Sequence, residues 1–243
     1  MRFADKICVV TGGASGIGRA TCSILATEGG IVAVVDVDAD GGRSTANDLR
    51  DKGYEATFVA ADGAVAPDVR AAVDDVVGRW GHIDVLVNCA ARLSFDPVVD
   101  LADEAWDAVL ATNLRSVFLW SKYSLPHMPP GGSVVNVSSV HAQRSTQNVA
   151  PYAASKAAME AFTRVLAQEC EAQEIRVNCV APGAVDTPML WSNPLVRSGQ
   201  EKIDGRIGSP EEVAAAIAFL AADAASFVTG TVLAVDGGRL TKL

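Results

Sequence analysis

Short apolar runs alternate with longer stretches of helical periodicity along nearly the whole chain. Most of these runs, such as ICVV, IVAVV, IDVLV and SVVNV, are apolar at consecutive positions instead of alternating with polar residues. Strands that are buried on both faces require this pattern, and such strands form parallel sheets that helices cover. The pattern predicts a parallel sheet of seven strands, at residues 7–11, 31–36, 56–61, 83–88, 133–139, 175–181 and 231–235.

Helical periodicity fills the intervals between the runs, and the strongest start signal stands before the last helix. Ser209 can cap that helix, Pro210 suits its first position, and Glu212 completes a capping box with the serine. Gly29 and Gly30 can end the first helix. Strands that alternate with helices are typical of a doubly wound α/β fold with helices on both faces of the sheet. The helices are expected at residues 16–27, 40–52, 67–80, 103–124, 152–173 and 210–221.

Two irregular segments interrupt this alternation, at residues 127–132 and 183–208. The second is too long for a plain connection within a compact α/β unit, so we expect a lid or a binding loop there. No repeat, low-complexity tract or shift in composition marks a domain boundary. One domain is therefore expected over residues 1–243.

The acidic balance of the chain limits the partners that it can have. Hydrophobic residues make up 49% of the chain and charged residues 20%, as in ordinary globular proteins. The formal net charge of -9 repels the phosphate backbone of nucleic acids. A local basic patch around Arg115, Arg144 and Arg164 remains open as an alternative. We expect a small-molecule partner and no nucleic acid.

The cysteines and the apolar stretches indicate where the protein resides. The five cysteines lie within apolar runs, without a CxxC or Cys/His ligand spacing. They are expected to be buried and reduced, with no metal bound. No stretch approaches the roughly 20 apolar residues of a membrane span, and the first residues enter a glycine-rich turn without a signal-peptide core. The sequence predicts a cytoplasmic protein without membrane contact.

A glycine-rich turn, TGGASGIG at residues 11–18, follows the first predicted strand directly and opens into the first helix. Its glycines allow a tight turn and let a pyrophosphate approach the N–H groups at the helix start, whose partial positive charge binds anions. A turn of this kind can also be a plain connection between a strand and a helix. Its place between a buried strand and a helix favours nucleotide binding.

Asp36 ends the second predicted strand, 18 residues after Gly18. A carboxylate there can accept hydrogen bonds from both ribose hydroxyls of an adenosine and would repel a 2′-phosphate. No basic residue occupies Ala14, Ser15 or Val37 to neutralise such a phosphate. The alternative is a solvated acidic residue at a strand end. After the glycine-rich turn, Asp36 favours NAD over NADP as the cofactor.

A serine, a tyrosine and a lysine form a further group. Ser139 ends the fifth predicted strand, and Tyr152 and Lys156 lie four residues apart, on one face of the following helix. The pKa of a free phenol is about 10, and a lysine ammonium at about 4 Å supplies roughly 4 kcal/mol toward lowering it. The alternative is an amphipathic tyrosine beside a solvated lysine. Small residues such as Ala153 and Ala157 leave room for a cofactor beside the pair.

These pieces stand in order with several others along the chain. The matching motifs are TGGASGIG at 11–18, Asp36, Asp62, Asn88, Asn113 in ATNL, VNVSS at 135–139, YAASK at 152–156 and PGAVDTPM at 182–189. With these motifs the chain resembles the short-chain dehydrogenase/reductase family over nearly its whole length. So many matches in order make the resemblance highly specific.

The resemblance implies a catalytic tetrad of Asn113, Ser139, Tyr152 and Lys156. Tyr152 would exchange a proton with the reacting oxygen, to which Ser139 would hydrogen-bond. Lys156 would hold the nicotinamide ribose and lower the pKa of the tyrosine. Asn113 would support a water-mediated proton relay; the alternative is an amide inside a helix that bonds to neighbouring backbone.

The resemblance also implies a Rossmann-type fold, with a cofactor half at roughly 1–90 and a catalytic and substrate half at roughly 91–243, with the lid at 183–208. Ala91 and Gly63 depart from the residues common in the family at their positions. Asp62 is a candidate for the adenine amino group or a loop residue. The expected cofactor-binding residues are Gly12, Ser15, Gly16, Ile17, Gly18, Asp36, Val37, Asp62, Gly63, Asn88, Ala90, Tyr152, Lys156, Pro182, Gly183, Val185 and Thr187.

Residues that flank the motifs are expected to build the substrate pocket. His141 could donate a hydrogen bond to a polyhydroxylated substrate or be a loop histidine without a role. Phe95 and Trp191 could face an apolar substrate or close the lid. The expected substrate-binding residues are Ser139, His141, Gln143, Tyr152 and Trp191, with Ser94, Phe95 and Asn148 beside them.

The leading hypothesis is an NAD(H)-dependent oxidoreductase that interconverts a secondary alcohol and its ketone by hydride transfer, with Tyr152 as general acid and base. Sugars and polyols are candidate substrates within this class. The resemblance leaves a 3-oxoacyl thioester (acyl carrier protein) reductase as the alternative, against which Asp36 and the net charge of -9 speak. A dinucleotide-binding protein without turnover is a third reading, which the complete tetrad disfavours.

The resemblance further implies a homotetramer that assembles through the two long helices and the C-terminal strand. The helices predicted at 103–124 and 152–173 carry more small and apolar residues than one core face needs, among them Phe118, Ala161 and Phe162.

Overall fold

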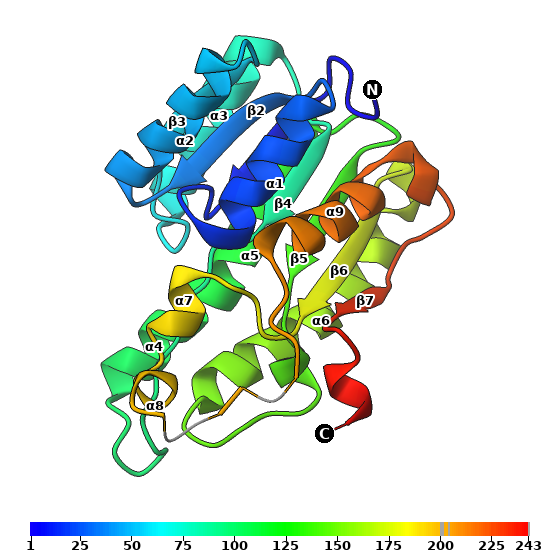
Figure 1. Cartoon of the computed structure of the whole chain (residues 1–243). Helices are drawn as coiled ribbons and strands as arrows, with labels where there is room; N and C mark the ends of the chain where they lie inside the picture. The colour runs from blue at the N-terminus through cyan, green and yellow to red at the C-terminus, as the bar shows by residue number, and fades with distance from the viewer. Residues whose placement is uncertain (200–201, 204, 243) are drawn as a thin grey trace.

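Seven apolar runs form one parallel sheet in the computed structural model, which describes residues 1–199, 202–203 and 205–242 (Figure 1). The strands are β1 (Ile7–Thr11), β2 (Ile31–Asp36), β3 (Ala56–Ala60), β4 (Val85–Asn88), β5 (Ser133–Val137), β6 (Arg176–Pro182) and β7 (Val232–Val235). They lie in the order β3-β2-β1-β4-β5-β6-β7. Every residue of β1, β4, β5 and β6 is buried, because helices cover both faces of the central strands.

The strand β1 lies between β2 and β4 and marks the point where the winding of the chain reverses. Val9 pairs with Ala33 of β2 on one side and with Leu86 of β4 on the other. The chain first winds outward to β3, then crosses back to β4 and winds the other way to β7. The loops that leave β1 and β4 diverge at this point, where open α/β sheets bind ligands.

Helices cover both faces of the sheet. Leu25 of α1 and Ile217 of α9 belong to the apolar core on one face, which α2 also joins. Trp120 of α5 and Leu166 of α6 belong to the core on the other face, with α3. The helices are α1 (Gly16–Thr27), α2 (Ala39–Asp51), α3 (Ala66–Trp80), α4 (Asp103–Leu110), α5 (Ser116–Ser124), α6 (Ala150–Glu169), α7 (Pro188–Trp191), α8 (Pro194–Arg197) and α9 (Pro210–Ala221).

Shorter helical turns connect these elements. A π-helical turn, η1 (Ala111–Arg115), joins α4 to α5. The short 3-10 helices are η2 (Leu125–His127), η3 (Val140–Ala142), η4 (Glu171–Gln173), η5 (Asp223–Ala225) and η6 (Arg239–Thr241).

The predicted doubly wound parallel sheet with helices on both faces is confirmed, and the elements differ from the prediction mainly at their ends. The helix predicted at 103–124 is continuous but contains the turn η1, because apolar periodicity does not show a local change of hydrogen-bond pattern. The capping box before α9 is confirmed: Ser209 Oγ accepts from the Glu212 N–H at 3.4 Å, and a Glu212 carboxylate oxygen accepts from the Ser209 N–H at 2.9 Å.

None of the helices in the described residues has both the length and the apolar composition that crossing a membrane requires. The same residues hold no group of three or more His, Cys, Asp or Glu side chains that could bind a metal ion. Residues 200, 201 and 204 of the predicted lid, and residue 243 of the predicted domain, lie outside the described residues.

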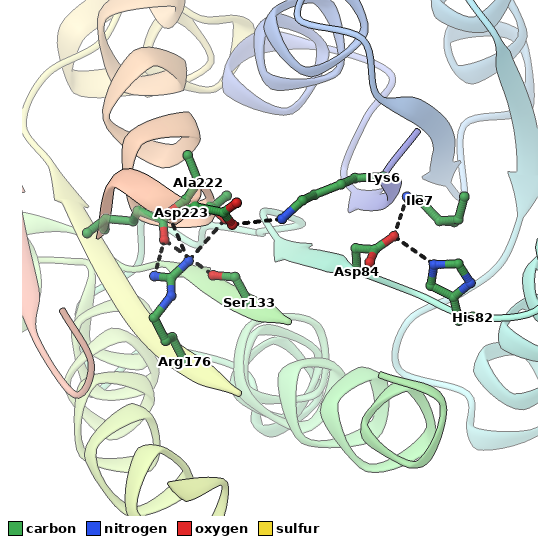
Figure 2. Close-up of polar contacts among 10 residues, drawn as sticks. Lys6, Ile7, His82, Asp84, Ser133, Arg176, Ala222 and Asp223 are labelled. Atoms are coloured by element: carbon green, nitrogen blue, oxygen red, sulfur yellow. Dashed lines mark hydrogen bonds and ion pairs between the residues drawn. The ribbon is translucent and has the colours of Figure 1, made fainter. Parts of the chain in front are cut away.

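Polar side chains join the elements at the amino-terminal edge of the sheet (Figure 2). Buried Arg176, the first residue of β6, donates to the carbonyl oxygens of Leu220, Ala221 and Ala222 at 2.5, 3.1 and 3.1 Å. These carbonyls lie at the C-terminal end of α9, where the helix leaves acceptors without intrahelical partners and where a positive charge is favourable. The arginine therefore fixes α9 against the sheet.

Replacing Arg176 by methionine is expected to lower the free energy of unfolding by about 2–3 kcal/mol, because the buried carbonyls of α9 lose a charged donor. Urea unfolding followed by circular dichroism at one protein concentration measures this loss. The control is Arg79→Met, which removes an exposed pair with Asp75 on α3 and should cost less than about 1 kcal/mol. Equal losses for the two variants would contradict the capping role of Arg176.

Candidate active site

A cleft of about 370 Å³ opens at the carboxyl edge of the sheet. It is lined by the glycine-rich turn after β1, the end of β2, the loop after β4, the start of α6, and the segment after β6 that carries α7 and α8. These segments are distant in sequence and meet because parallel strands all end at the same edge. Part of the predicted lid, including Met189, Leu190 and Val196, forms one wall of this cleft.

A wider hollow of about 930 Å³ lies at the opposite edge, around the polar contacts of Figure 2. Its Lys6 pairs with Asp223 at 2.8 Å, and its Arg176 binds the carbonyl groups of α9. These charged side chains connect elements of the fold. The predicted catalytic side chains lie at the carboxyl edge, so we place the active site in the smaller cleft.

The glycine-rich turn forms the floor of the cleft next to α1. Gly12 has a φ of 69°, and a Cβ atom on it would lie 2.8 Å from the Ala90 backbone, so a side chain there is excluded on both counts. Ser15 is the N-cap residue of α1, but its side chain makes no capping hydrogen bond. Within the described residues, the first N–H groups of α1 therefore receive no cap from the Ser15 side chain and are suited to bind an anion.

Asp36 lies at the β2 end of the cleft, and its carboxylate is oriented by backbone. One carboxylate oxygen accepts from the Ala14 N–H at 3.0 Å, and the other accepts from the Asp38 N–H at 2.9 Å. Each oxygen keeps a further lone pair for a ligand hydroxyl. Lys156 and Arg239 are the Lys and Arg residues among the described residues that line the cleft. Neither belongs to the chain segments beside Asp36.

Tyr152 and Lys156 lie one helical turn apart near the start of α6, and both line the cleft. The side chains are deeply buried, with residue exposures of 8% and 1%. Lys156 Nζ donates to the Val137 carbonyl at the end of β5 at 2.7 Å and lies 5.5 Å from the centre of the Tyr152 ring. Ser139 is the N-cap residue of η3, where its side chain accepts from the His141 N–H at 3.2 Å, and it lies close enough to Tyr152 to act on the pKa of the tyrosine. The structure thus brings the three side chains together.

Burial is the main cause of the pKa shifts of Tyr152 and Lys156. Burial raises the pKa of Tyr152 to about 12, although the hydrogen bond with Ser139 acts to lower it. Burial also lowers the pKa of Lys156 to about 8. In the chain alone, removal from water disfavours the phenolate more than its neighbours favour it. The lowering of the Tyr152 pKa by Lys156 stays a prediction for the enzyme with its cofactor.

Asn113 is buried within the π-helical turn η1 and is not among the residues that line the cleft. Its side chain accepts from the Arg92 N–H at 2.7 Å and donates to the Arg92 carbonyl at 2.9 Å and to Ser155 Oγ at 3.1 Å. The amide thus ties the loop after β4 to α6. This geometry matches the alternative in which the amide bonds to neighbouring backbone.

Most of the predicted cofactor residues line the cleft. Asn88 instead donates to Asn136 Oδ1 at 2.8 Å within the sheet, since its side chain points to the interior. Asp62 is exposed and accepts from the Ala64 N–H at 2.9 Å, and Gly63 faces the indole of Trp120. The predicted residues that line the cleft are Gly12, Ser15, Gly16, Ile17, Gly18, Asp36, Val37, Ala90, Tyr152, Lys156, Pro182, Gly183, Val185 and Thr187.

The predicted substrate residues separate into two groups. His141 lines the cleft, with its ring centre 5.9 Å from that of Tyr152 in an edge-on arrangement. Gln143 is exposed outside the cleft lining. Trp191 is 47% exposed and donates its indole N–H to Asp186 at 2.7 Å, which turns it away from the lining. The structure thus places Gln143 and Trp191 outside the cleft lining, because flanking a motif does not determine where a side chain points.

Several residues that line the cleft were not predicted individually. Among them is Cys89, and burial raises its pKa to about 12, so its thiol stays protonated. Another is Arg239, and a Gly-Gly pair directly before it was the available signal. The lining also includes an apolar wall of Leu93, Phe95, Val149, Met189, Leu190, Val196 and Ile203. Phe95 was expected there by name, and Met189, Leu190, Val196 and Ile203 belong to the lid predicted at 183–208.

Comparison with known proteins agrees with this geometry. The family model described as enoyl-(acyl carrier protein) reductase matches residues 12–239. The chain is 43% identical over 243 residues to cis-4-hydroxycyclohexanecarboxylate dehydrogenase of Sinomonas cyclohexanicum, with 97% of each chain covered. It is 38% identical to 3-oxoacyl-(acyl carrier protein) reductase FabG of Thermotoga maritima, covering 98% of this chain and 99% of the relative. The solved structure of levodione reductase is similar over 100% of both chains, with 34% identity and a TM-score of 0.93.

The chain belongs to the short-chain dehydrogenase/reductase family. It is therefore an oxidoreductase of a family that binds nicotinamide dinucleotides, on a single Rossmann-type domain. The cleft fits such a cofactor: the uncapped start of α1 suits a pyrophosphate, Asp36 suits ribose hydroxyls, and Lys156 lies beside the segment after β6.

Proposed function

We propose that this short-chain dehydrogenase/reductase interconverts a secondary alcohol and its ketone with NAD(H), using Tyr152 as general acid and base. The observation that carries the proposal is the buried pair of Tyr152 and Lys156 in the same cleft as the glycine-rich turn, with Ser139 buried next to Tyr152. A nicotinamide dinucleotide bound in this cleft supplies the hydride acceptor or donor.

The protein's part of the reaction is to bind the substrate oxygen and to move one proton. Because its pKa is raised to about 12, Tyr152 holds its proton on Oη at neutral pH, the state that donates to a ketone oxygen. In oxidation Tyr152 first gives its proton to solvent through the predicted relay water, and the phenolate Oη then receives the alcohol proton. Lys156, charged below about pH 8 and one turn away, stabilises that phenolate. Ser139 hydrogen-bonds to the reacting oxygen. Asn113 positions the group of Ser139, Tyr152 and Lys156, and the predicted relay water lies beside Asn113.

The apolar wall of the cleft supports a small secondary alcohol with an aliphatic or alicyclic body over a sugar or polyol. The relative from Sinomonas is a dehydrogenase of a hydroxycyclohexane carboxylate, which fits this class. The reductase of Thermotoga supports the 3-oxoacyl thioester alternative. A rate for an acetoacetyl thioester above that for every secondary alcohol in a screen would select that alternative.

The orientation of Asp36 supports NAD as the preferred dinucleotide. Its carboxylate is held by two backbone N–H groups at the β2 end of the cleft, where a 2′-phosphate would meet a negative charge. The 2′-hydroxyl of NAD would instead donate a charge-assisted hydrogen bond to this carboxylate.

Replacing Tyr152 by phenylalanine is expected to lower kcat by roughly 10²–10⁴-fold, because the proton donor and acceptor is lost. Cyclohexanol oxidation followed at the NADH absorbance measures kcat, and titration of NADH fluorescence should show unchanged cofactor binding. The control Tyr54→Phe alters a half-buried tyrosine that is not among the residues lining the cleft. Undiminished turnover by the Tyr152 variant would contradict the assignment of Tyr152 as the proton donor and acceptor.

Replacing Asp36 by asparagine is expected to raise the KM for NAD roughly tenfold to a hundredfold, since hydrogen bonds from hydroxyls to a charged acceptor are lost. The KM for NADP should fall, because the repulsion of its phosphate is removed. Steady-state kinetics with both dinucleotides test this. Asp40→Asn, a fully exposed residue of α2, is the control. A wild-type preference for NADP would overturn the assignment.

We also propose the homotetramer expected from the sequence. Phe118 of α5 and Val165 of α6 are 45% and 54% exposed, so both helices named in the prediction carry solvent-exposed apolar side chains. Phe219 of α9, near β7, is 40% exposed. Light scattering should give about four times the chain mass of 25.2 kDa. A stable monomer at micromolar concentration would refute this assembly.

The location of the protein stays a prediction. All five cysteines are free, and four of them are buried, which suits the reducing cytoplasm that the sequence indicates.

A further inference from the structure

A buried carboxyl group lies one helical turn beyond Lys156 and has no part in the reaction proposed above. Glu160 of α6 is 7% exposed and is not among the described residues that line the cleft. Removing a carboxyl group from water costs free energy unless the group is hydrogen-bonded. An apolar side chain would fill this position without that cost, so the contacts of the carboxyl group bear on the role of the residue.

Glu160 contacts Ser138, which is 2% exposed and directly follows β5. Ser138 Oγ lies within hydrogen-bonding distance of two acceptors, Glu160 Oε1 at 3.1 Å and the Lys156 carbonyl oxygen at 3.2 Å. The Ser138 N–H donates to the Val180 carbonyl of β6 at 2.7 Å. Ser138 therefore joins the end of β5 both to α6 and to β6.

The residues on either side of Ser138 belong to the proposed reaction. The carbonyl of Val137 accepts from Lys156 Nζ at 2.7 Å and so fixes the position of the ammonium group. Ser139, on the other side, is buried next to Tyr152. A displacement of the backbone at Ser138 would move both groups at once.

The protonation of Glu160 determines how the proton of the serine hydroxyl is shared. Burial raises the pKa of Glu160, while the hydrogen bond with Ser138 and the charge of Arg164 act to lower it. Cys179 of β6 lies near both Glu160 and Lys156, which act on its pKa in opposite directions. The hydroxyl has one proton for two acceptors. A protonated carboxyl group can donate to Ser138, which then donates to the Lys156 carbonyl, and a glutamine amide can donate in the same direction.

We propose that Glu160 is a positioning residue, which acts through Ser138 to fix the end of β5. The Val137 carbonyl and Ser139, on either side of that serine, then keep the positions that proton exchange requires. This inference rests on the proposed alcohol and ketone chemistry. Glu160 itself exchanges no proton with the substrate, so its removal lowers the rate of the chemical step and leaves the binding of the dinucleotide unchanged.

The test compares Glu160→Leu with Glu160→Gln in the full-length protein, with cyclohexanol oxidation followed at the NADH absorbance. The leucine variant should lower kcat roughly tenfold, because one buried hydrogen bond is lost, and should change the KM for NAD less than about twofold. The glutamine variant keeps the contact and should retain most of the rate. Glu169→Leu, at an exposed glutamate of the same helix, is the matched control.

A double-mutant cycle tests whether the effect of Glu160 passes through Ser138. Ser138→Ala should lower kcat by a factor similar to that of Glu160→Leu. In the Ser138→Ala background, Glu160→Leu should lower kcat less than about threefold further, because the contact is already absent. Additive losses would show that the two residues act independently and would overturn the inference.

Further results would also overturn it. An undiminished kcat in Glu160→Leu, together with a lower free energy of unfolding, would show a role in stability alone. Equal losses in Glu160→Leu and Glu160→Gln would reject the hydrogen bond as the basis of the effect. Ser138→Ala removes a single oxygen atom, so it decides the matter if Glu160→Leu does not fold: an unchanged kcat in this variant rejects the positioning role.

Hydrogen exchange separates this inference from the proposed function, because it needs no turnover. Peptides that cover residues 133–140 should exchange faster in Glu160→Leu than in the wild type and in Glu160→Gln, since the Ser138 N–H is held by the Val180 carbonyl. This result supports the positioning role even if no alcohol is oxidised. Unchanged exchange rejects the role while leaving the alcohol chemistry in place.

Discussion

Parallel pairing of β1 with β2 on one side and with β4 on the other is the constraint on which the active site depends. It directs the carboxyl ends of all strands to one edge, so the loops after β1, β4, β5 and β6 meet there. Groups that bind an anion, a ribose and a reacting oxygen come from distant parts of the chain. The sheet, and no single loop, fixes the positions of these groups relative to one another.

Burial of the Tyr152 and Lys156 pair sets the chemical character of the site. Both side chains are removed from water, which raises the pKa of the phenol to about 12 and lowers that of the ammonium to about 8. The neutral tyrosine and the charged lysine remain the stable pair at pH 7. The carbonyl of Val137, which accepts from Lys156, anchors that charge at the end of β5.

The two ends of the cleft differ in charge although the chain as a whole is acidic. Asp36 presents a carboxylate at the β2 end, and Arg239 presents a guanidinium at the β6 and β7 end. Between them lie Tyr152, Lys156 and the apolar wall. Under the proposed function the β2 end binds the dinucleotide, and Tyr152 exchanges the proton between the two ends.

The sequence by itself determined the doubly wound sheet, the capping of α9, the glycine-rich turn and the Tyr152–Lys156 pair, because these features follow from local periodicity and from spacing within one helix. The tertiary structure alone decided that Asn88 and Asn113 turn into the interior and that Trp191 turns outward to Asp186. It also brought Arg239 into the cleft and made burial the main influence on Tyr152. These outcomes depend on contacts between residues far apart in the chain, which no local pattern encodes.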